Sequence, residues 1–442
     1  MCGLITSLDT RVSYEDIKKA IDKMSYRGDV PSVVTPCEEG FAAHVSLPLC
    51  SLDPYAYSQP VNGFSFVGEI FNYKEIDPSA VNDVHMIRDL IIEKENESQF
   101  SWIKDLHRLD GFWAISYINK ENQLIAISDY LSQKPIYYRT DRNVVASEID
   151  CLLDLAKVTE DKVYMSNIMK WGYDPTGRTP YNEIKQMPPG SIYKDGIIET
   201  YWDWSLIQAQ DLVLDNLTKA VANRIDASRP ISLLLSGGLD SSIIYEIAKR
   251  FIPGIKVFHV ENDESQYADL ITKNRTNVKL DNVTDEEAVA IHQTPVDLGS
   301  VKPQIALAKA IKKEKGYQIV LTGDGADELF GGYRRSQDYD SQMSDVFLEL
   351  PYYHLPKLDR VMMHSTTEVR SPFLAPYMVK FAMSLPYSER INKKHLKEAV
   401  SRFIPEEIIN RKKVPLKTKE IALGLLTNTK NNINTFRRLK ND

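Results

Sequence analysis

Residues 236–241 read Ser-Gly-Gly-Leu-Asp-Ser and combine the residue types that a phosphate-binding turn requires. The apolar run at residues 231–235 before them predicts a short buried strand. Apolar residues then recur at helical spacing from position 243 to position 248, which predicts a helix. A strand, a glycine turn and a helix N-terminus together present backbone N–H groups to an anion. The sequence therefore predicts a phosphate site at this turn.

The turn lacks the lysine that grips β- and γ-phosphates in a Walker loop, because Asp240 stands before Ser241. It instead resembles the pyrophosphate loop of ATP pyrophosphatases, which cut ATP between its α- and β-phosphates. This resemblance implies that ATP binds across a run of seven residues, namely Leu235, Ser236, Gly237, Gly238, Leu239, Asp240 and Ser241. The alternative is a Rossmann-type turn that binds no nucleotide.

A second acidic turn follows the strand predicted at residues 318–321. Gly323 and Gly325 leave its backbone open, while Asp324 and Asp327 project from a strand-to-helix turn. Carboxylates beside a phosphate loop suit Mg²⁺, so we expect Asp240, Asp324 and Asp327 to hold that ion. We expect Gly323, Asp324 and Gly325 of this turn to bind ATP as well. The alternative is an acidic helix N-terminus stabilised by the helix dipole.

The bulk composition restricts the class of protein. At 442 residues, with 43% hydrophobic and 26% charged residues, the chain has room for two or three globular domains. Its formal charge of −7 argues against a nucleic-acid partner, and no apolar run approaches the ~20 residues of a membrane span. The four cysteines have neither zinc-site nor disulfide-framework spacing. We expect a cytoplasmic protein with small-molecule substrates, and the sequence leaves a homodimer open.

Cys2 is a candidate nucleophile. Removal of Met1 would give it a free α-amino group, whose pKa of about 8 suits a general base for the thiol. Five stretches follow Cys2 in order: Ser25-Tyr26-Arg27-Gly28-Asp29, Val67 to Tyr73, Leu109 to Ala114, Asp129 through Lys134 to Tyr138, and Ala146-Ser147-Glu148.

In that order these stretches resemble the class II glutamine amidotransferase domain, an N-terminal-nucleophile fold with two antiparallel sheets between helical layers. The resemblance implies that Cys2 attacks glutamine and that the N–H of Gly68 serves the oxyanion. It also implies that Arg27, Gly28 and Asp83 surround the glutamine.

Two departures from that family pattern lie in the same pocket. The family's A-H-x-R-L stretch has an arginine that grips the glutamine α-carboxylate, and Ser46 stands there in this chain. The family's N-G-E-[IV]-[YF]-N stretch has an asparagine in the oxyanion hole, and Val67 replaces it. Loss of one oxyanion donor costs about 10²–10³ in rate. We therefore expect a weak glutaminase, or one whose glutamine clamp comes from elsewhere in the chain.

The second half of the chain resembles the asparagine synthetase family. Thr322 to Tyr333 resembles the family motif S-G-E-G-[SA]-D-E-[LV]-F-G-G-Y, and Asp359-Arg360 opens a D-R-x-x-M stretch. Lys393 begins a K-x-x-L-[RK] stretch, which implies that its ammonium stabilises an adenylate and a tetrahedral intermediate. The alternative for Lys393 is a solvated basic helix face. Residues 411–413, Arg-Lys-Lys, either border the same site or lie on the surface.

Elements predicted from residue patterns must position these side chains. In the first half, strands are expected at 63–67, 113–118, 124–128 and 136–138, with amphipathic helices at 12–24 and 84–95. In the second half, a helix at 206–227 leads into strands and helices that alternate, which indicates a parallel sheet. We expect an α/β protein with an Ntn-hydrolase αββα sandwich at residues 2–204. A pyrophosphate-loop domain with a helical C-terminal part is expected at residues 205–442.

Together the two resemblances imply ATP-dependent amide synthesis with Mg²⁺. Aspartate or a related carboxylate would be adenylated and then amidated by ammonia from glutamine. Three alternatives stay open: amidation or cyclisation of another carboxylate with an impaired glutaminase, a nucleotide-binding regulator without turnover, and an RNA-modifying ATP pyrophosphatase. The last usually needs a basic RNA-binding region or sulfur-handling cysteines, and neither is visible in the sequence.

Overall fold

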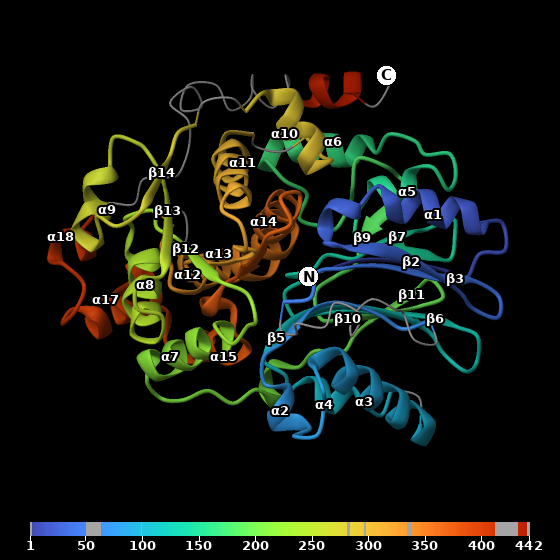
Figure 1. The fold of residues 1–442 in the computed structure, drawn as a ribbon, viewed down its shortest axis with the longest axis horizontal. Coiled ribbons are helices and arrows are strands. Elements are labelled where there is room, and N and C mark those ends of the chain that lie inside the picture. The colour runs from blue at the N-terminus through green and yellow to red at the C-terminus, as the bar shows by residue number, and fades with distance from the viewer. Residues whose placement is uncertain are drawn as a thin grey trace. The chain divides into compact units, whose positions relative to one another are not determined.

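The computed structural model describes residues 2–49, 63–98, 100–280, 283–295, 298–333, 338–411 and 432–439. The chain divides into two compact units (Figure 1). The first comprises Met1–Leu206 together with Pro351–Asp359, and the second comprises Ile207–Leu350 together with Arg360–Asp442. The first unit is therefore completed by a short segment from far along the sequence.

Two antiparallel sheets form the centre of the first unit. One has the strand order β2-β3-β1-β8-β7-β9, with bounds β1 Cys2–Ser7, β2 Val30–Pro36, β3 Phe41–Ser46, β7 Tyr137–Arg139, β8 Val144–Ala146 and β9 Ile184–Gln186. The other has the order β11-β10-β6-β5-β4, with bounds β4 Ser65–Ile70, β5 Gly111–Ile118, β6 Leu124–Ser128, β10 Ser191–Lys194 and β11 Ile197–Thr200.

Helices cover the outer faces of both sheets (Figure 1). On one side lie α1 and α5, and on the other lie α2, α3 and α4, with bounds α1 Tyr14–Asp22, α2 Tyr73–Ile76, α3 Asp83–Glu97, α4 Ile103–Leu106, α5 Asp150–Leu153 and α6 Lys162–Trp171. Because both sheets are covered, β1 and β6 are buried along their whole length. The αββα sandwich expected for the first half is confirmed.

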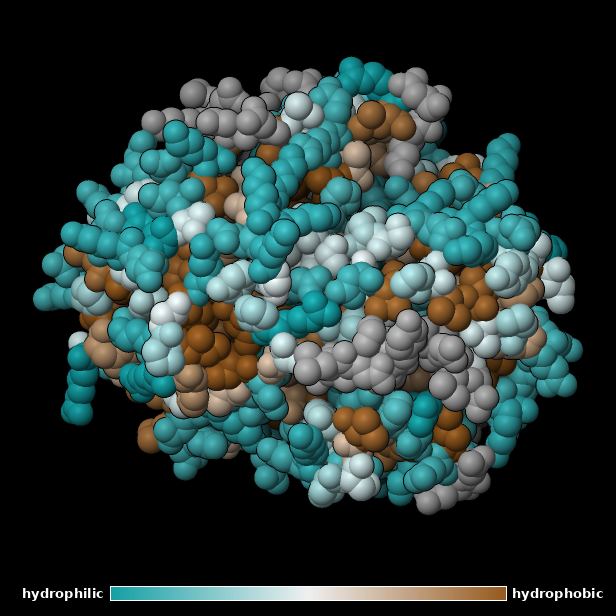
Figure 2. Space-filling model, in the orientation of Figure 1, coloured by the Kyte–Doolittle hydropathy of each residue, from teal (hydrophilic) through white to brown (hydrophobic). Residues whose placement is uncertain are grey.

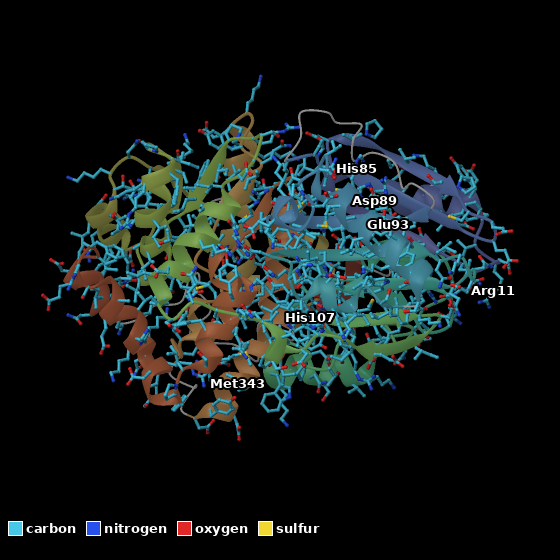
Figure 3. The ribbon with its side chains drawn as sticks, turned by 90° about the horizontal axis from the view of Figure 1, so that it is seen from below. Arg11, His85, Asp89, Glu93, His107 and Met343 are labelled. Carbon is cyan, nitrogen blue, oxygen red and sulfur yellow. The ribbon has the colours of Figure 1, made fainter. Side chains whose placement is uncertain are left out.

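Helix α3 shows how the sequence sets the layers. Asn82 caps it by accepting from the N–H of His85 at 2.8 Å, so the helix begins at Asp83. Its inner face buries Met86, Ile87 and Ile91. His85, Asp89 and Glu93 follow one another in a row along the helix (Figure 3).

A five-stranded parallel sheet forms the centre of the second unit. Its order is β14-β13-β12-β15-β16, with bounds β12 Ile231–Leu234, β13 Lys256–Val260, β14 Thr276–Val278, β15 Ile319–Leu321 and β16 Glu368–Arg370. Helices follow the strands and make up the C-terminal part, with bounds α7 Val213–Arg224, α8 Leu239–Phe251, α9 Ser265–Ile271, α10 Asp285–His292, α11 Leu298–Lys313, α12 Ala326–Leu329, α13 Tyr339–Ser344, α14 Leu355–Met363, α15 Pro376–Ser384, α16 Tyr387–Arg390, α17 Lys394–Val400 and α18 Glu406–Ile409. The predicted parallel-sheet architecture is confirmed.

The helix predicted at 206–227 is shorter in the structure. A 3₁₀ turn spans Trp204–Leu206, and α7 begins only at Val213. The amide side chain of Asn216 explains the gap, because it accepts from the N–H of Gln210 at 2.9 Å and donates to the C=O of Gln210 at 2.8 Å. These two bonds hold the chain outside a helix, as side-chain hydrogen bonds to backbone commonly do.

The surface is polar over most of the face shown in Figure 2, where hydrophobic residues form separate patches. Large exposed apolar side chains such as Val81, Ile197 and Leu212 are far apart in the sequence: Val81 and Leu212 precede α3 and α7, and Ile197 begins β11. Across the residues placed by the structure, no helix has the length and apolar character needed to cross a membrane.

Candidate active sites

Cys2 lies at the start of β1, directly opposite Ser46 of β3, and is only 6% exposed. Burial alone would raise the pKa of its thiol. With Met1 still attached, the N-terminal ammonium and His44 outweigh burial and lower the pKa to about 7. A substantial fraction of the Cys2 side chain is therefore thiolate at neutral pH, which is the form that attacks a carbonyl.

His44 shares a face of the sheet with Cys2 and Ser46, because β3 pairs His44 with Leu4 and Ser46 with Cys2. Its Nε2 lies 2.8 Å from the C=O of Phe66 and must donate there, since a carbonyl only accepts. Its Nδ1 lies 2.9 Å from the hydroxyl of Ser46. Ser46, which replaces the family arginine, is thus tied to the histidine that lowers the thiol pKa.

Asp83 and Gly68 occupy the neighbouring elements. The Asp83 carboxylate accepts from the N–H groups of Ile70 and Val84, at 3.0 and 2.9 Å. Burial nevertheless raises the pKa of Asp83 to about 6. Gly68 has φ +146°, and a Cβ there would collide with the C=O of Phe112, so only glycine fits. The proposed roles of Asp83 and Gly68 toward glutamine stay predictions.

A cluster of buried charged side chains contacts the backbone of Cys2. Arg27 Nε donates to the C=O of Cys2 at 3.0 Å, Nη1 to Glu148 at 2.5 Å, and Nη2 to Asp359 at 2.8 Å. Lys134 Nζ lies 2.7 Å from the other oxygen of Asp359. All four charged side chains are at most 4% exposed. Gly28, next to Arg27, lets β2 start against β3, because a Cβ there would collide with the C=O of Ser46.

In the second unit, the glycine-rich turn joins β12 to α8 as its residue pattern predicts. Gly237 has φ +73°, and its added Cβ would lie 2.7 Å from the backbone nitrogen of Ala268 in α9. Ser236 and Ser241 close the turn: Ser236 N–H donates to Ser241 Oγ at 3.1 Å, and Gly238 N–H donates to Ser236 Oγ at 3.2 Å. Leu239 opens α8, while the N–H of Leu235 is held by Phe258 at 2.9 Å.

The second acidic turn follows β15 and meets the first. A Cβ on Gly323 would lie 2.8 Å from the backbone nitrogen of Ser241, so the two turns approach closely. Gly325 has φ +92° and precedes α12, which carries Asp327. Asp324 is half-buried in the same turn.

Lys393 joins the two turns. Its Nζ lies 2.6 Å from both carboxylate oxygens of Asp240 and 2.6 Å from Asp327 Oδ1. Burial would lower the pKa of Lys393, but the two carboxylates outweigh it and raise the pKa above its usual range. Asn392 and Lys393 have φ of +55° and +58°, a conformation uncommon for residues other than glycine. The lysine is therefore a fixed cation at the N-terminal end of α8, and the alternative of a solvated basic face is wrong for it.

Whether the acidic residues fit Mg²⁺ can be judged from their donor atoms. Asp240, Asp324 and Asp327 offer the carboxylate oxygens that Mg²⁺ prefers, beside a turn suited to phosphates. Two of them hold the Lys393 ammonium, however. Within the described ranges no group of three or more His, Cys, Asp or Glu side chains is placed to hold a metal ion. The residues thus fit an ion that arrives with phosphate oxygens rather than a preformed cage.

Arg411 supports the glycine turn from the C-terminal part. Its Nη1 donates to the C=O of Gly237 at 2.8 Å, it forms an ion pair with Glu264, and its guanidinium lies 4.4 Å above the Tyr267 ring. Of the two alternatives for residues 411–413, Arg411 therefore borders the site. Lys412 and Lys413 lie outside the described residues.

Several residues of these sites lay inside recognisable motifs but had no predicted role. His44, Lys134, Glu148 and Asp359 belong to stretches that resemble family motifs, and this was the available signal. What the sequence lacks is their pairing, because Arg27 and Asp359 are separated by 332 positions.

The comparison with known families matches both halves of the chain. The family model described as glutamine amidotransferase domain matches residues 1–202, and the one described as asparagine synthase matches residues 212–351 and 339–429. A probable glutamine-hydrolysing asparagine synthetase of Acanthamoeba polyphaga mimivirus is 26% identical over 394 residues, covering 78% of this chain and 70% of that protein.

Two bacterial relatives align over most of the chain. Asparagine synthetase 3 of Bacillus subtilis strain 168, described as glutamine-hydrolysing, is 23% identical over 94% of this chain and 86% of its own length. Asparagine synthetase B of Escherichia coli strain K12, also described as glutamine-hydrolysing, is 24% identical over 93% of this chain and 81% of its own length.

Proposed function

Because this chain belongs to the glutamine-hydrolysing asparagine synthetase family, we propose that it makes an amide from a carboxylate, ATP and the amide nitrogen of glutamine. The carboxylate that we propose is the side chain of aspartate, which gives asparagine. Residues 2–204 would form the glutaminase domain and residues 205–442 the synthetase domain. The segment Pro351–Asp359 would then serve the glutaminase although it lies in the synthetase part of the sequence.

In the glutaminase half, the Cys2 thiolate attacks the side-chain carbonyl of glutamine and expels ammonia. Water then hydrolyses the thioester to glutamate. The N–H of Gly68 stabilises the oxyanion, and Asp83 holds the substrate's α-ammonium, which a buried carboxylate binds strongly. Ser46 and Val67 stand where the family has an arginine and an asparagine, so glutamine would be bound and turned over weakly.

In the synthetase half, ATP binds along residues 235–241 with its phosphates at the N-terminus of α8. The aspartate carboxylate attacks the α-phosphorus, pyrophosphate leaves, and ammonia then displaces AMP from the acyl-adenylate. Lys393 stabilises the negative charge that develops in these steps. Asp240, Asp324 and Asp327 would hold Mg²⁺, which neutralises phosphate charge when bound.

The observation that carries this proposal is the position of Lys393. Its ammonium contacts Asp240 of the glycine turn and Asp327 of the acidic turn, so three separate motifs of the sequence converge on one point. Such convergence is what an adenylating site needs, and it is not needed by a turn that binds no nucleotide.

Pyrophosphate release from Mg-ATP and aspartate, measured with glutamine and with ammonium chloride, tests the proposal. Wild-type protein should release pyrophosphate with both donors and form asparagine. Cys2→Ala should lose only the glutamine-dependent rate, whereas Cys37→Ala should lose neither. Lys393→Met should lower both rates by about 10²-fold or more. Absence of aspartate-dependent release from wild-type protein would contradict the proposed acceptor.

A further inference from the structure

We propose that Asp359 is a positioning residue for the Cys2 nucleophile and acts on it through Arg27. The inference rests on the proposed glutaminase role of Cys2. Asp359 does not contact the reacting atoms. It fixes the guanidinium that holds the Cys2 backbone.

The chain of contacts is short and fully buried. Asp359 binds Arg27 through one oxygen at 2.8 Å and Lys134 through the other at 2.7 Å. Arg27 in turn donates from Nε to the C=O of Cys2 at 3.0 Å. The Arg27 and Asp359 side chains are 1% and 2% exposed, so water does not substitute for any of these contacts.

Three different acceptors fix the plane of the Arg27 guanidinium. A guanidinium is a rigid fork, so holding Nη1 at Glu148 and Nη2 at Asp359 also fixes the direction of the Nε–H bond. That bond points at the carbonyl of Cys2. Without Asp359 one arm of the fork loses its partner, and Cys2 at the start of β1 is held less firmly.

Charge balance also depends on Asp359. The cluster holds two cations, Arg27 and Lys134, and two anions, Glu148 and Asp359. Burial would raise the pKa of Asp359, but Arg27 and Lys134 keep it below its usual value, so the carboxylate is ionised. Removing that charge leaves two buried cations facing one carboxylate. The two cations then move apart to reach solvent or other partners.

The backbone that carries Asp359 is itself held in the first unit. Gln186 Nε2 donates to the C=O of Pro351 at 2.8 Å, at the start of the same segment. Gly177 packs against the Tyr352 ring, since a Cβ there would lie 3.3 Å from the ring. The segment Pro351–Asp359 therefore delivers its carboxylate from a fixed position.

The test compares Asp359→Asn with Asp161→Asn in the full-length chain. Asp161 is a matched control: its side chain is 1% exposed and also pairs with two cations, Arg178 and Lys185. For Asp359→Asn we expect glutaminase kcat to fall about 10- to 100-fold while KM for glutamine stays within about twofold. For Asp161→Asn, and for ammonia-dependent pyrophosphate release in both variants, we expect changes within about twofold. Equal glutaminase kcat in the two variants overturns the inference.

Two further measurements keep the result interpretable. If Asp359→Asn does not fold, Lys134→Met combined with Asp359→Asn restores charge balance. It should keep ammonia-dependent activity but not glutaminase, and full recovery of glutaminase overturns the inference. If wild-type protein shows no glutaminase, the rate of Cys2 alkylation by iodoacetamide becomes the readout. Alkylation slower in Asp359→Asn than in Asp161→Asn supports the inference, and equal rates overturn it. Failure of the proposed synthesis itself would show only as missing pyrophosphate release.

Discussion

Removing His44 should make the Cys2 thiol less acidic. With Met1 attached, the N-terminal ammonium and His44 bring the pKa of Cys2 to about 7, from an ordinary value of 9.0. A lowered pKa means more thiolate at a given pH. Half of the thiol is then ionised at about pH 7, and only about a tenth would be ionised if the pKa rose by about one unit. His44→Gln should therefore slow reactions of the thiolate at pH 7 about fivefold.

The assay measures the rate of Cys2 alkylation by iodoacetamide across pH 5.5 to 9.5. The reaction is monitored by the loss of glutaminase activity and by the increase in protein mass. Glutamine suits position 44 because its amide can still donate to the C=O of Phe66, which His44 serves at 2.8 Å. An unpaired carbonyl would otherwise cost about 1–3 kcal/mol and confuse the result. His85→Gln, on the outer row of α3 in Figure 3, is the control and should leave the midpoint unchanged.

The expected midpoint is about 7 for wild-type protein and higher for His44→Gln. A common midpoint for the two proteins would refute the argument that His44 ionises the thiol. A lowered plateau without a shifted midpoint would refute it as well, because that result indicates blocked access rather than altered acidity.

Three other outcomes follow from the same structure. The pKa of Asp83, about 6, lies above the ordinary carboxyl value, so the stability that Asp83 contributes is present below about pH 4 and is lost as the pH rises through 6. Asp83→Asn should therefore raise the free energy of unfolding at pH 8 by about 2 kcal/mol in urea titrations. The same variant should bind glutamine more weakly. Gly237→Ala should lower the thermal stability of the protein by more than Gly254→Ala. Both glycines have φ above +70°, but only a Cβ at position 237 would lie within 3 Å of backbone atoms. Equal losses of stability in the two variants would exclude this clash. Arg411→Ala frees the C=O of Gly237 and should raise KM for ATP severalfold in pyrophosphate release, with Arg438→Ala, an exposed pair on Glu286, as the unaffected control.

Local features of these sites could be predicted from the sequence. The turn from Ser236 to Ser241 is specified by neighbouring residues, because glycines set its backbone and apolar spacing sets the strand and helix around it. The same is true of β6. Its residues are mainly apolar without alternating with polar ones, which is typical of a strand buried on both faces. Lys393 could be placed near the phosphates only through its likeness to a family motif.

Pairings between distant positions could not be predicted. Asp359 looks like part of the second half of the chain, yet its carboxylate binds Arg27 and Lys134 in the first unit. His44 lies on the face of β3 that meets Cys2, and this follows from the register of two strands rather than from its own neighbours. Tertiary packing decides both, and one sequence without aligned relatives carries no direct record of it.

The discontinuous first unit also has a consequence for how the chain folds during synthesis. Asp359 is synthesised long after the other three charged residues of the cluster, Arg27, Lys134 and Glu148. Until then the two cations have only one carboxylate as a partner. Closing contacts over 225 and 332 positions is slow compared with forming local ones. The glutaminase half should therefore reach its final structure only after most of the second unit has been made. A nascent chain stalled before residue 351 should hold Cys2 in an incompletely ordered environment, more open to protease than the finished protein.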